Sequence, residues 1–583
     1  MRARAPITLG LLASVATLVA CTHSAPPPPA PRSAPVAASA PAFGPAKIDA
    51  ALRAAWTKEG IVPAARADDA TFLRRAYLDV TGTIPPPDVA AAFLEDRSPD
   101  KRAKLVDSLV ASQAYADHWA TYWDDVLMGK SRLGQAVDRA AFRRWLVGRF
   151  TAREPWDRIV TGLVAATGQS STPPMGEEAS PGEPPEDGAV NWTLRYREAP
   201  QDLAGSASRI FLGVQIQCAQ CHDHKTEKWT QEDFRGFASP FLRAKITPID
   251  KTKGMQRFAL ADEDRAPPRY AKSEDVGPIA RAKPRALDGT SLEAGKGTRK
   301  ALAAWMTSPK NPWFSRALVN RMWGHFLGRG FVDPVDDMRA SNPAVLPELL
   351  DALAADFVAH GFDLGHLVRT ICATEAYQLA ADKEAKVDPE NKLWARFHLV
   401  PLGSEELLNA VLRATRIEDA AARVGLPNVE QLRAQLERQV GFLFDVDEED
   451  DTPDYEGTVS QALALLNGGL VGNGARAVPG SALADVLAGP GDDAAKVERL
   501  ALQVLSRRPT PAEREAWVGY VRDPQRSAAP PPSGGGPKNP KKGGTGPLAR
   551  LDRKPSGAAD PRRAAYEDLL WAWLNSSEFV FNH

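Results

Sequence analysis

The sequence predicts a mainly α-helical protein with two helical domains, long irregular connections and low-complexity insertions. Apolar residues recur at helical spacing along most of the chain, helix start and stop signals flank these stretches, and strand-like alternation is scarce. Residues 71–80 are representative, because Phe72, Ala76 and Val80 form one stripe and Gly82 supplies a C-terminal signal. The fold class therefore follows from periodicity together with capping.

The composition is that of an ordinary soluble globular protein. Hydrophobic residues make up 43% and charged residues 25% of 583 residues, which is enough to build several cores. The 72 basic and 73 acidic residues nearly cancel, so no global field favours nucleic acid as a partner. No stretch beyond the N-terminus is apolar for long enough to cross a bilayer.

The N-terminus predicts a lipoprotein signal peptide over residues 1–20. A basic start precedes a short apolar stretch that ends just before Cys21, the residue expected to be lipidated. An ordinary secretory signal with an unrelated cysteine is the alternative. Residues 21–44, rich in Pro, Ala and Ser, are expected to be a tether. The predicted location is the cell envelope, lipid-anchored and facing the periplasm or the cell surface. Thr22 after the cysteine favours the outer membrane.

The first domain is expected over residues 45–243. Residues 85–88 open a helix, and residues 98–100 (Ser-Pro-Asp) combine an N-cap, a first-turn proline and an acid at the positive end of the helix dipole. Residues 115–128 form an aromatic-rich helix, and residues 137–146 continue the pattern. This domain is therefore expected to be helical.

The remaining segments of the first half surround a cysteine-rich stretch at 218–224. A helix is expected at 202–213, and residues 230–233 form a capping-box start for another, so the stretch lies between two helices. Residues 171–189 are interpreted as a disordered loop, and the polar residues 244–296 as an irregular linker.

The second domain is expected over residues 297–583 and is again helical. Helical patterns occur at 314–326, 347–362 and 566–581. A Pro/Gly/Lys-rich insertion at about 524–563 is predicted to be disordered, and the last helix is expected to dock back onto the second domain.

The candidate functional centre is residues 218–224, Cys-Ala-Gln-Cys-His-Asp-His, with two of the four cysteines and two of the nine histidines. Cys218, Cys221 and His222 form the C-x-x-C-H pattern of covalent c-type haem attachment. Each thiol can bond to one haem vinyl group, and the adjacent imidazole can ligate the iron. Haem c is therefore the first candidate cofactor.

Two other chemistries fit the same residues. Zinc could be bound by Cys218 and Cys221 with one or both of His222 and His224. In an oxidising compartment the two cysteines could instead form a disulfide without any cofactor. Cys372 lies in an apolar helical pattern and is expected to be a buried core residue.

A six-coordinate haem also needs a second axial ligand. His224 is too near in sequence to reach the opposite face of the iron easily. His118, His325, Met255 and Met338 are the other candidates, although such histidines and methionines more often belong to a core.

Other catalytic patterns are weak. The chain lacks a G-x-S-x-G elbow, an H-E-x-x-H pair, a phosphate loop and a dinucleotide fingerprint. Acids that could line a polar cleft, or equally serve as caps and turn residues, are Asp124 and Asp125 near His118, and Asp333, Asp336 and Asp337 near Arg339. No motif assigns an enzymatic reaction.

Several stretches together resemble a known family pattern. They are Phe72-Leu73-Arg74-Arg75-Ala76-Tyr77-Leu78-Asp79, His118-Trp119, residues 211–217 before the cysteine motif, Lys228-Trp229-Thr230-Gln231, Asn311-Pro312-Trp313-Phe314, Val319-Asn320-Arg321 and residues 574–579. The chain is similar to exported two-domain proteins, first noted in planctomycetes, built from domain-of-unknown-function families 1549 and 1553. The resemblance covers nearly everything after residue 48 except the low-complexity insertions. It implies a cytochrome-like 1549-type domain followed by a 1553-type domain.

Together these inferences predict a lipid-anchored extracytoplasmic cytochrome-like protein that binds haem c for electron transfer or redox chemistry. Its expected partners are the membrane, through the anchor, and a redox protein. One alternative is a non-redox envelope protein for binding or assembly, with a structural zinc or disulfide site. Another is a metal-dependent enzyme that acts on extracellular polymers.

Overall fold

The computed structural model describes residues 43–129, 137–170, 188–250, 257–381, 388–423, 469–524 and 560–583, with scattered residues between 425 and 440. The predicted signal peptide, Cys21, Met255, most of the tether and most of both low-complexity insertions lie outside the described residues. No helix in the described ranges is long and apolar enough to cross a membrane.

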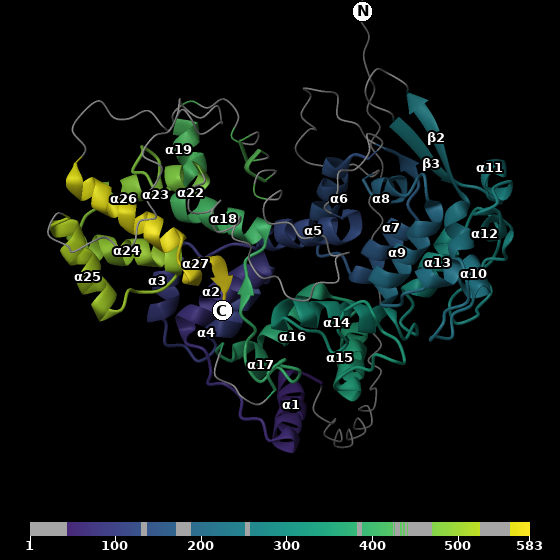
Figure 1. The fold of residues 1–583 in the computed structure, drawn as a ribbon, viewed down its shortest axis with the longest axis horizontal. Helices are drawn as coiled ribbons and strands as arrows, with labels where there is room; N and C mark the ends of the chain where they lie inside the picture. Colours follow the sequence, from purple (N-terminus) through teal and green to yellow (C-terminus); the bar gives the residue numbers. More distant parts are fainter. Residues whose placement is uncertain are drawn as a thin grey trace, which may run out of the picture. The chain divides into compact units, whose positions relative to one another are not determined.

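The fold is mainly α-helical, as predicted (Figure 1). The helices of the first half are α1 (Pro45–Glu59), α2 (Asp69–Thr81), α3 (Pro87–Glu95), α4 (Lys101–Val110), α5 (Gln113–Met128), α6 (Arg139–Thr151), α7 (Trp156–Val164), α8 (Val190–Arg195), α9 (Pro200–Leu212), the 3-10 turn η1 (Gln217–Gln220) and α10 (Gln231–Leu242).

Local capping explains several of these boundaries. Helix α2 ends at Gly82, whose φ of 62° is the left-handed conformation that glycine adopts without strain. The predicted capping box at Thr230 and Asp233 is confirmed at the start of α10. The predicted N-cap at Ser98 is wrong, because Ser98 bonds to Asp96 and α4 begins only at Lys101.

Residues 244–296 were interpreted as an irregular linker, but they contain regular secondary structure. Strands β2 (Ala244–Asp250) and β3 (Arg257–Asp262) pair antiparallel, and β1 (Gly168–Gln169) adds to the other edge in the order β1-β3-β2. In β3 the buried Phe258 and Leu260 alternate with more exposed residues, a pattern too short to stand out in the sequence.

The rest of this segment packs against the helical core. It contains α11 (Pro268–Ala271) and α12 (Gly277–Arg281), and α12 lies against α10. Tyr270, Ile279 and Leu287 are buried in the main core, so this connection is part of the folded body.

The second half is helical apart from one short strand pair. Its elements are α13 (Thr298–Met306), α14 (Phe314–Leu327), α15 (Pro347–Ala359), α16 (Leu364–Cys372), α17 (Glu375–Gln378), β4 (Val400–Pro401), α18 (Ser404–Thr415), α19 (Ile417–Arg423), α22 (Gly469–Gly474), α23 (Ala482–Ala488), α24 (Asp493–Leu505), α25 (Pro511–Arg522), α26 (Pro561–Leu574), α27 (Ser577–Val580) and β5 (Phe581–Asn582). Cys372 is buried, as expected.

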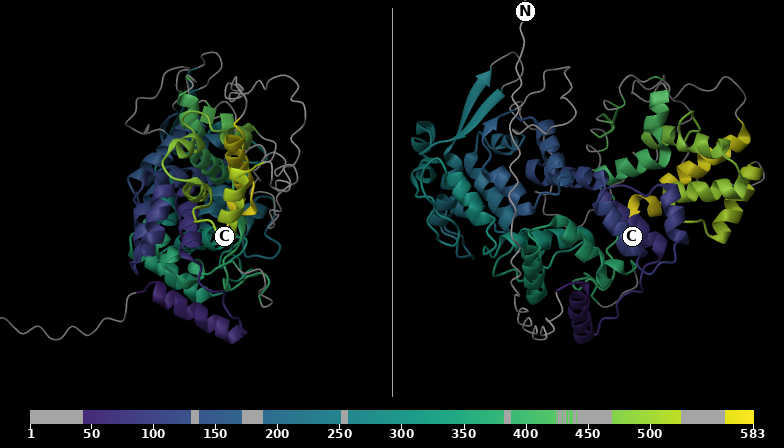
Figure 2. Two further views of the ribbon diagram at one scale, coloured as in Figure 1. Left: turned by 90° about the vertical axis from the view of Figure 1, so that its left-hand side faces the viewer. Right: turned by 180° about the vertical axis from the view of Figure 1, so that it is seen from behind.

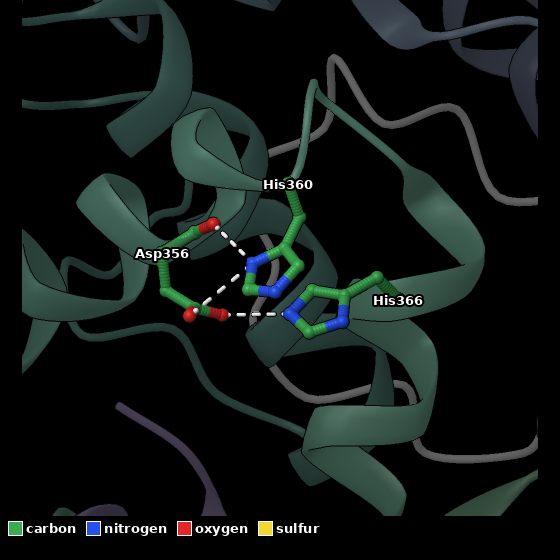
Figure 3. A group of neighbouring side chains, drawn as sticks. All are labelled: Asp356, His360 and His366. Carbon is green, nitrogen blue, oxygen red and sulfur yellow. Dashed lines mark hydrogen bonds and ion pairs between the residues drawn. The ribbon is translucent and has the colours of Figure 1, made fainter. Parts of the chain in front are cut away.

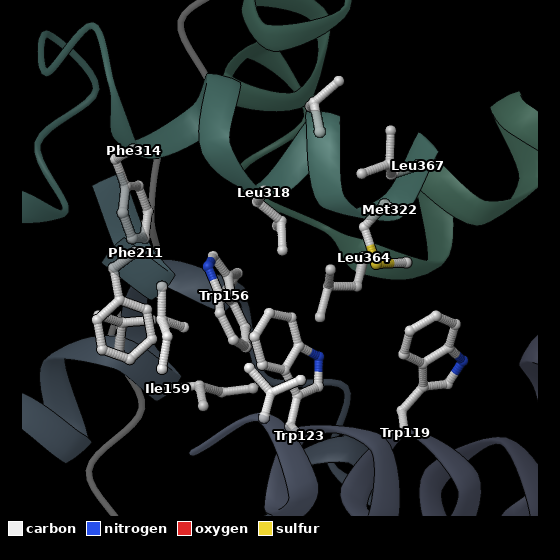
Figure 4. Close-up of a cluster of buried hydrophobic side chains, with 14 of the residues drawn as sticks. Trp119, Trp123, Trp156, Ile159, Phe211, Phe314, Leu318, Met322, Leu364 and Leu367 are labelled. Carbon is white, nitrogen blue, oxygen red and sulfur yellow. The ribbon is translucent and has the colours of Figure 1, made fainter. Parts of the chain in front are cut away.

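One hydrophobic core runs through both halves of the chain (Figure 4). The indole rings of Trp123 and Trp156, from α5 and α7, have centroids 4.2 Å apart. Leu318 and Met322 of α14 and Leu364 of α16 belong to the same cluster. Residues 43–583 accordingly form one compact unit in which the two halves share buried surface.

A second core joins α18 and α22–α27 to the first half. It includes Leu78 and Ile84, which lie at the end of α2 and just beyond it. Helix α26 packs against α25 and α24, so the prediction that the last helix docks onto the second half is confirmed.

The C-terminal residues also reach α2, beside which the C-terminus lies in Figures 1 and 2. Arg74 Nη2 donates to the carbonyl oxygen of Phe579 at 2.6 Å, and Asn582 Nδ2 donates to Asp79 Oδ1 at 2.6 Å. Strand β5 pairs with β4 and fixes this segment. The end of the chain therefore covers a helix near its beginning.

Candidate functional site

The cysteine motif lies between α9 and α10, as expected from the sequence. Cys218 is in the η1 turn and Cys221 directly follows it. Both thiols are free and exposed, whereas Ala219 between them is buried and attaches the turn to the core. Both sulfurs are therefore accessible for a reaction.

Hydrogen bonds hold the motif against the start of α10. Gln231 Nε2 donates to the Cys221 carbonyl oxygen at 2.5 Å, and the Gln231 amide donates to Asp223 Oδ1 at 2.8 Å. His222 Nδ1 lies 2.8 Å from the Asp223 carbonyl oxygen. A ring nitrogen that faces a carbonyl oxygen carries a proton, so in the neutral imidazole the lone pair of His222 is on Nε2.

His224 has a different environment. Its Nδ1 accepts hydrogen bonds from the amides of Thr226 and Glu227 at 3.3 and 3.1 Å. Its own amide donates to the Trp229 carbonyl oxygen at 2.8 Å. His224 therefore shapes the turn that leads into α10.

The donors of the motif do not converge on one point. Within the part of the chain that the structure describes, two groups of three or more His, Cys, Asp or Glu side chains bring their ligand atoms within 4.8 Å of one another. Neither group includes Cys218, Cys221, His222 or His224. A tetrahedral zinc set is thus not assembled at the motif.

Of the predicted second axial ligands, Met338 belongs to a segment beside the motif. Its amide donates to the carbonyl oxygen of Gly213, five residues before Cys218, at 2.7 Å. Ser341 in the same loop donates to Glu227 Oε1 at 2.8 Å. The loop after α14 therefore packs on both sides of the cysteine stretch.

The acids proposed to line a polar cleft are ion-pair partners instead. The pairs are Asp124 and Asp125 with Arg139, Asp333 with Arg329, Asp336 with Arg209 and Arg321, and Asp337 with Arg339. Their distances run from 2.6 to 3.7 Å. These carboxylates connect neighbouring elements, and the structure gives no support to a cleft built from them.

A polar cluster that the sequence analysis missed surrounds Asp79 on α2. The carboxylate accepts hydrogen bonds from the hydroxyl of Tyr377 at 2.7 Å and from Asn582 at 2.6 Å. Arg75 of the same helix donates to the carbonyl oxygens of Leu379 at 2.9 Å and His583 at 3.2 Å. Residues from three distant parts of the chain thus meet on α2.

Burial controls the electrostatics of this cluster. It raises the pKa of Asp79 to about 7, although the hydrogen bond from Tyr377 and the charge of Arg75 act in the opposite direction. It also raises the pKa of Tyr377 and lowers that of Arg75 to about 10. In the sequence, this cluster is indicated by charged residues that interrupt the apolar stripe of one helix. A buried carboxylate such as that of Asp79 needs hydrogen-bond or charged partners.

A cavity of about 260 Å³ adjoins this cluster. Its polar lining consists of Asp79, His325, His398, Glu406 and Asn582, and the remaining lining is mainly apolar. Burial, and then the charge of a second histidine on α5, lowers the pKa of His325 to about 3, so its imidazole is neutral.

That second histidine is His118, whose ring centroid lies 6.1 Å from that of His325. His118 Nδ1 is 3.5 Å from Glu405 Oε2. Burial lowers the pKa of His118, but Glu405, Glu406 and Asp79 together raise it by more, so the net shift is upward. Both predicted histidine candidates therefore lie together at this cluster.

The other convergent group is Asp356, His360 and His366, on and after α15 (Figure 3). His366 Nε2 lies 2.7 Å from Asp356 Oδ2, and His360 Nδ1 lies 3.4 Å from Asp356 Oδ1. The two imidazoles stack with centroids 3.6 Å apart. Each carboxylate oxygen already has a histidine partner, so this group is satisfied by itself.

Comparison with known families matches one stretch in each half of the chain. Residues 47–245 match the family described as Protein of unknown function (DUF1549), named PSCyt2. Residues 298–440 match the family described as Protein of unknown function (DUF1553), named PSD1. No curated protein and no solved structure matched the chain. The chain belongs to the proteins that combine these two families in one polypeptide.

Proposed function

We propose that the protein is a lipid-anchored, extracytoplasmic cytochrome-like protein in which Cys218, Cys221 and His222 hold haem c. The observation that carries this proposal is the hydrogen bond at 2.8 Å between His222 Nδ1 and a backbone carbonyl oxygen. That bond leaves Nε2 as the ligating atom and fixes the tautomer, as metal-bound histidines require.

The geometry favours haem over the two alternatives. Zinc would need the thiols and imidazoles to converge, whereas the turn separates them and His224 Nδ1 is engaged by backbone amides. Haem needs only two accessible thiols and one imidazole, because the porphyrin supplies the other four iron ligands. Cys218 and Cys221 are both exposed, as addition to haem requires.

Attachment conserves atoms and electrons. Each S–H adds across one vinyl C=C bond, a carbon–sulfur bond forms, and the thiol hydrogen moves to the neighbouring carbon. When bound, haem iron supplies one-electron redox chemistry. The protein holds the cofactor in place through two thioethers and aims one imidazole at its iron.

Met338 would be the favoured second protein ligand of the iron, because its loop bonds to the end of α9 and to the turn after the motif and its sulfur packs against Gly213. Methionine paired with histidine raises the reduction potential of haem iron. Such a site suits electron transfer to a redox partner protein. The proposed anchor is Cys21, which would keep the protein at the cell envelope.

The test is to purify the protein from a host with a working cytochrome c maturation system. We expect a Soret band, haem that resists acid-acetone extraction and a haem-stained band on a denaturing gel. Cys218→Ser with Cys221→Ser should abolish all three, whereas Cys372→Ser, at the buried cysteine, should retain them. Met338→Leu should keep covalent haem but change the visible spectrum.

Two results would contradict the proposal. One is a colourless wild-type protein from such a host. The other is one zinc ion per chain that disappears with the double cysteine substitution. The second outcome would establish the structural zinc alternative.

A further inference from the structure

A second site lies around His118, away from the cysteine motif and independent of its proposed haem. His118 is 2% exposed, and its ring lies against the end of α2. A Cβ atom at Gly82 would be only 2.4 Å from His118 Nδ1, so glycine is needed for this close approach. The ring is therefore held in a fixed, enclosed position.

Neither ring nitrogen of His118 makes a hydrogen bond within the described chain. Glu405 Oε2 lies 3.5 Å from Nδ1, within ion-pair distance. Buried polar atoms are nearly always hydrogen-bonded or bound to an ion, so an enclosed imidazole without a hydrogen bond needs an explanation.

Two carboxylates from the first turn of α18 converge on this ring. Ligand atoms of His118, Glu405 and Glu406 all lie within 4.8 Å of one another. Adjacent residues on a helix normally point in different directions, so convergence of this pair on one imidazole is unusual. Two donors bound to one ion at about 2.1 Å lie roughly 3–4 Å apart, close to the observed 3.5 Å.

The charges around the ring favour a cation. Three carboxylates, Asp79, Glu405 and Glu406, act on His118. Arg75, the nearby cation of α2, is engaged by backbone carbonyl oxygens. A divalent ion would complete the coordination of the imidazole.

The adjoining cavity provides space beside the proposed ligands. Glu406 and the neutral His325 both line its volume of about 260 Å³. This volume is sufficient for several water molecules or a small substrate group next to an ion. In contrast, the Asp356 group contains no buried nitrogen that lacks a hydrogen bond.

We propose that His118, Glu405 and Glu406 bind one divalent transition-metal cation, with the cavity supplying its exchangeable ligands. One imidazole and two carboxylates form an N,O donor set suited to Mn²⁺, Fe²⁺ or Zn²⁺. A metal in this position would be a Lewis acid at the junction of the two halves.

Mn²⁺ is the probe for this site, because thiolates bind it poorly and the cysteine motif will not compete. The full-length protein is treated with EDTA, the chelator is removed, and free Mn²⁺ is followed by electron paramagnetic resonance during titration. We expect Glu405→Gln and Glu406→Gln each to weaken the affinity at least tenfold. Asp356→Asn, in the other convergent group, should leave this affinity unchanged.

Far-UV circular dichroism and melting temperature in EDTA check that each variant is folded. Mn²⁺ should raise the melting temperature of the wild type and of Asp356→Asn, but not of Glu405→Gln. The proposal is overturned if the folded wild type binds no Mn²⁺ at millimolar concentration. It is also overturned if both glutamine variants bind like the wild type, or if Asp356→Asn alone removes binding.

Discussion

Asp79 allows a quantitative prediction about the pH dependence of stability. The residue is 8% exposed, and its carboxylate accepts hydrogen bonds from Tyr377 and Asn582. Asp79→Asn preserves the shape of the side chain but removes its ionisation. The NH2 group of the new amide would face a hydrogen-bond donor where the carboxylate had accepted, so the free energy of unfolding should fall by about 1–3 kcal/mol at every pH.

The pH-dependent part follows from the raised pKa of Asp79. In the unfolded chain the group loses its proton near pH 3.8, whereas in the folded protein it does so near pH 7. Between these values the folded state binds one more proton, so the free energy of unfolding falls as the pH rises. The slope reaches 1.36 kcal/mol per pH unit only midway between the two pKa values, so the loss between pH 4 and pH 7 is about 3 kcal/mol.

The measurement is urea denaturation of wild type and Asp79→Asn at intervals from pH 4 to pH 8. We expect the variant to be less stable at pH 4 and to gain relative to the wild type by about 4 kcal/mol before pH 8. Asp117→Asn, at an exposed position on α5, is the control and should give a curve parallel to the wild type. Parallel curves for Asp79→Asn as well would refute the reasoning that burial dominates at this carboxylate.

Three further substitutions test the packing. Gly82→Ala should lower the free energy of unfolding by several kcal/mol, because φ is +62° and the new methyl group would lie 2.4 Å from His118 Nδ1. Gly60→Ala has a similar φ of +67° but open space around it, so it should lower the free energy of unfolding by only about 1 kcal/mol. Urea denaturation measures both. Equal losses would disprove the steric argument. Trp123→Ala should lower the free energy of unfolding by about 3–5 kcal/mol, because the fully buried indole joins both halves; a loss near zero would contradict the shared core. Asn582→Ala should lower the free energy of unfolding by about 1–3 kcal/mol and raise the pKa of Asp79 further, because Asp79 loses a hydrogen-bond donor. The same series of urea denaturations at different pH values measures both effects. An unchanged pH profile would show that the contact between Asn582 and Asp79 is unimportant.

Local signals in the sequence predicted local structure well. The helical stripe of α2, its glycine stop and the capping box at Thr230 each depend on residues within a few positions of one another. The small sheet was missed because β1 pairs with residues 259–260 of β3, far away in the sequence, and the alternation within β3 is too short to stand out. The cysteine motif was visible because its chemistry requires a fixed spacing.

The Asp79 and His118 clusters were not visible in this way. His118 and His325 were considered as haem ligands or core residues, whereas their polar contacts come from α18 and α2. Buried charges on an amphipathic helix were the available signal, but they do not name their partners. Long-range packing selects those partners, and a single sequence contains no record of it.

The sequence by itself determined the helical class, several helix boundaries and the position of the C-x-x-C-H motif between two helices, because short-range periodicity, capping and motif spacing control them. The tertiary structure alone decided that the two halves share one core and that the C-terminus covers α2. It also decided that one imidazole and two carboxylates meet beside a cavity. These features depend on contacts between residues hundreds of positions apart, which only the folded chain brings together.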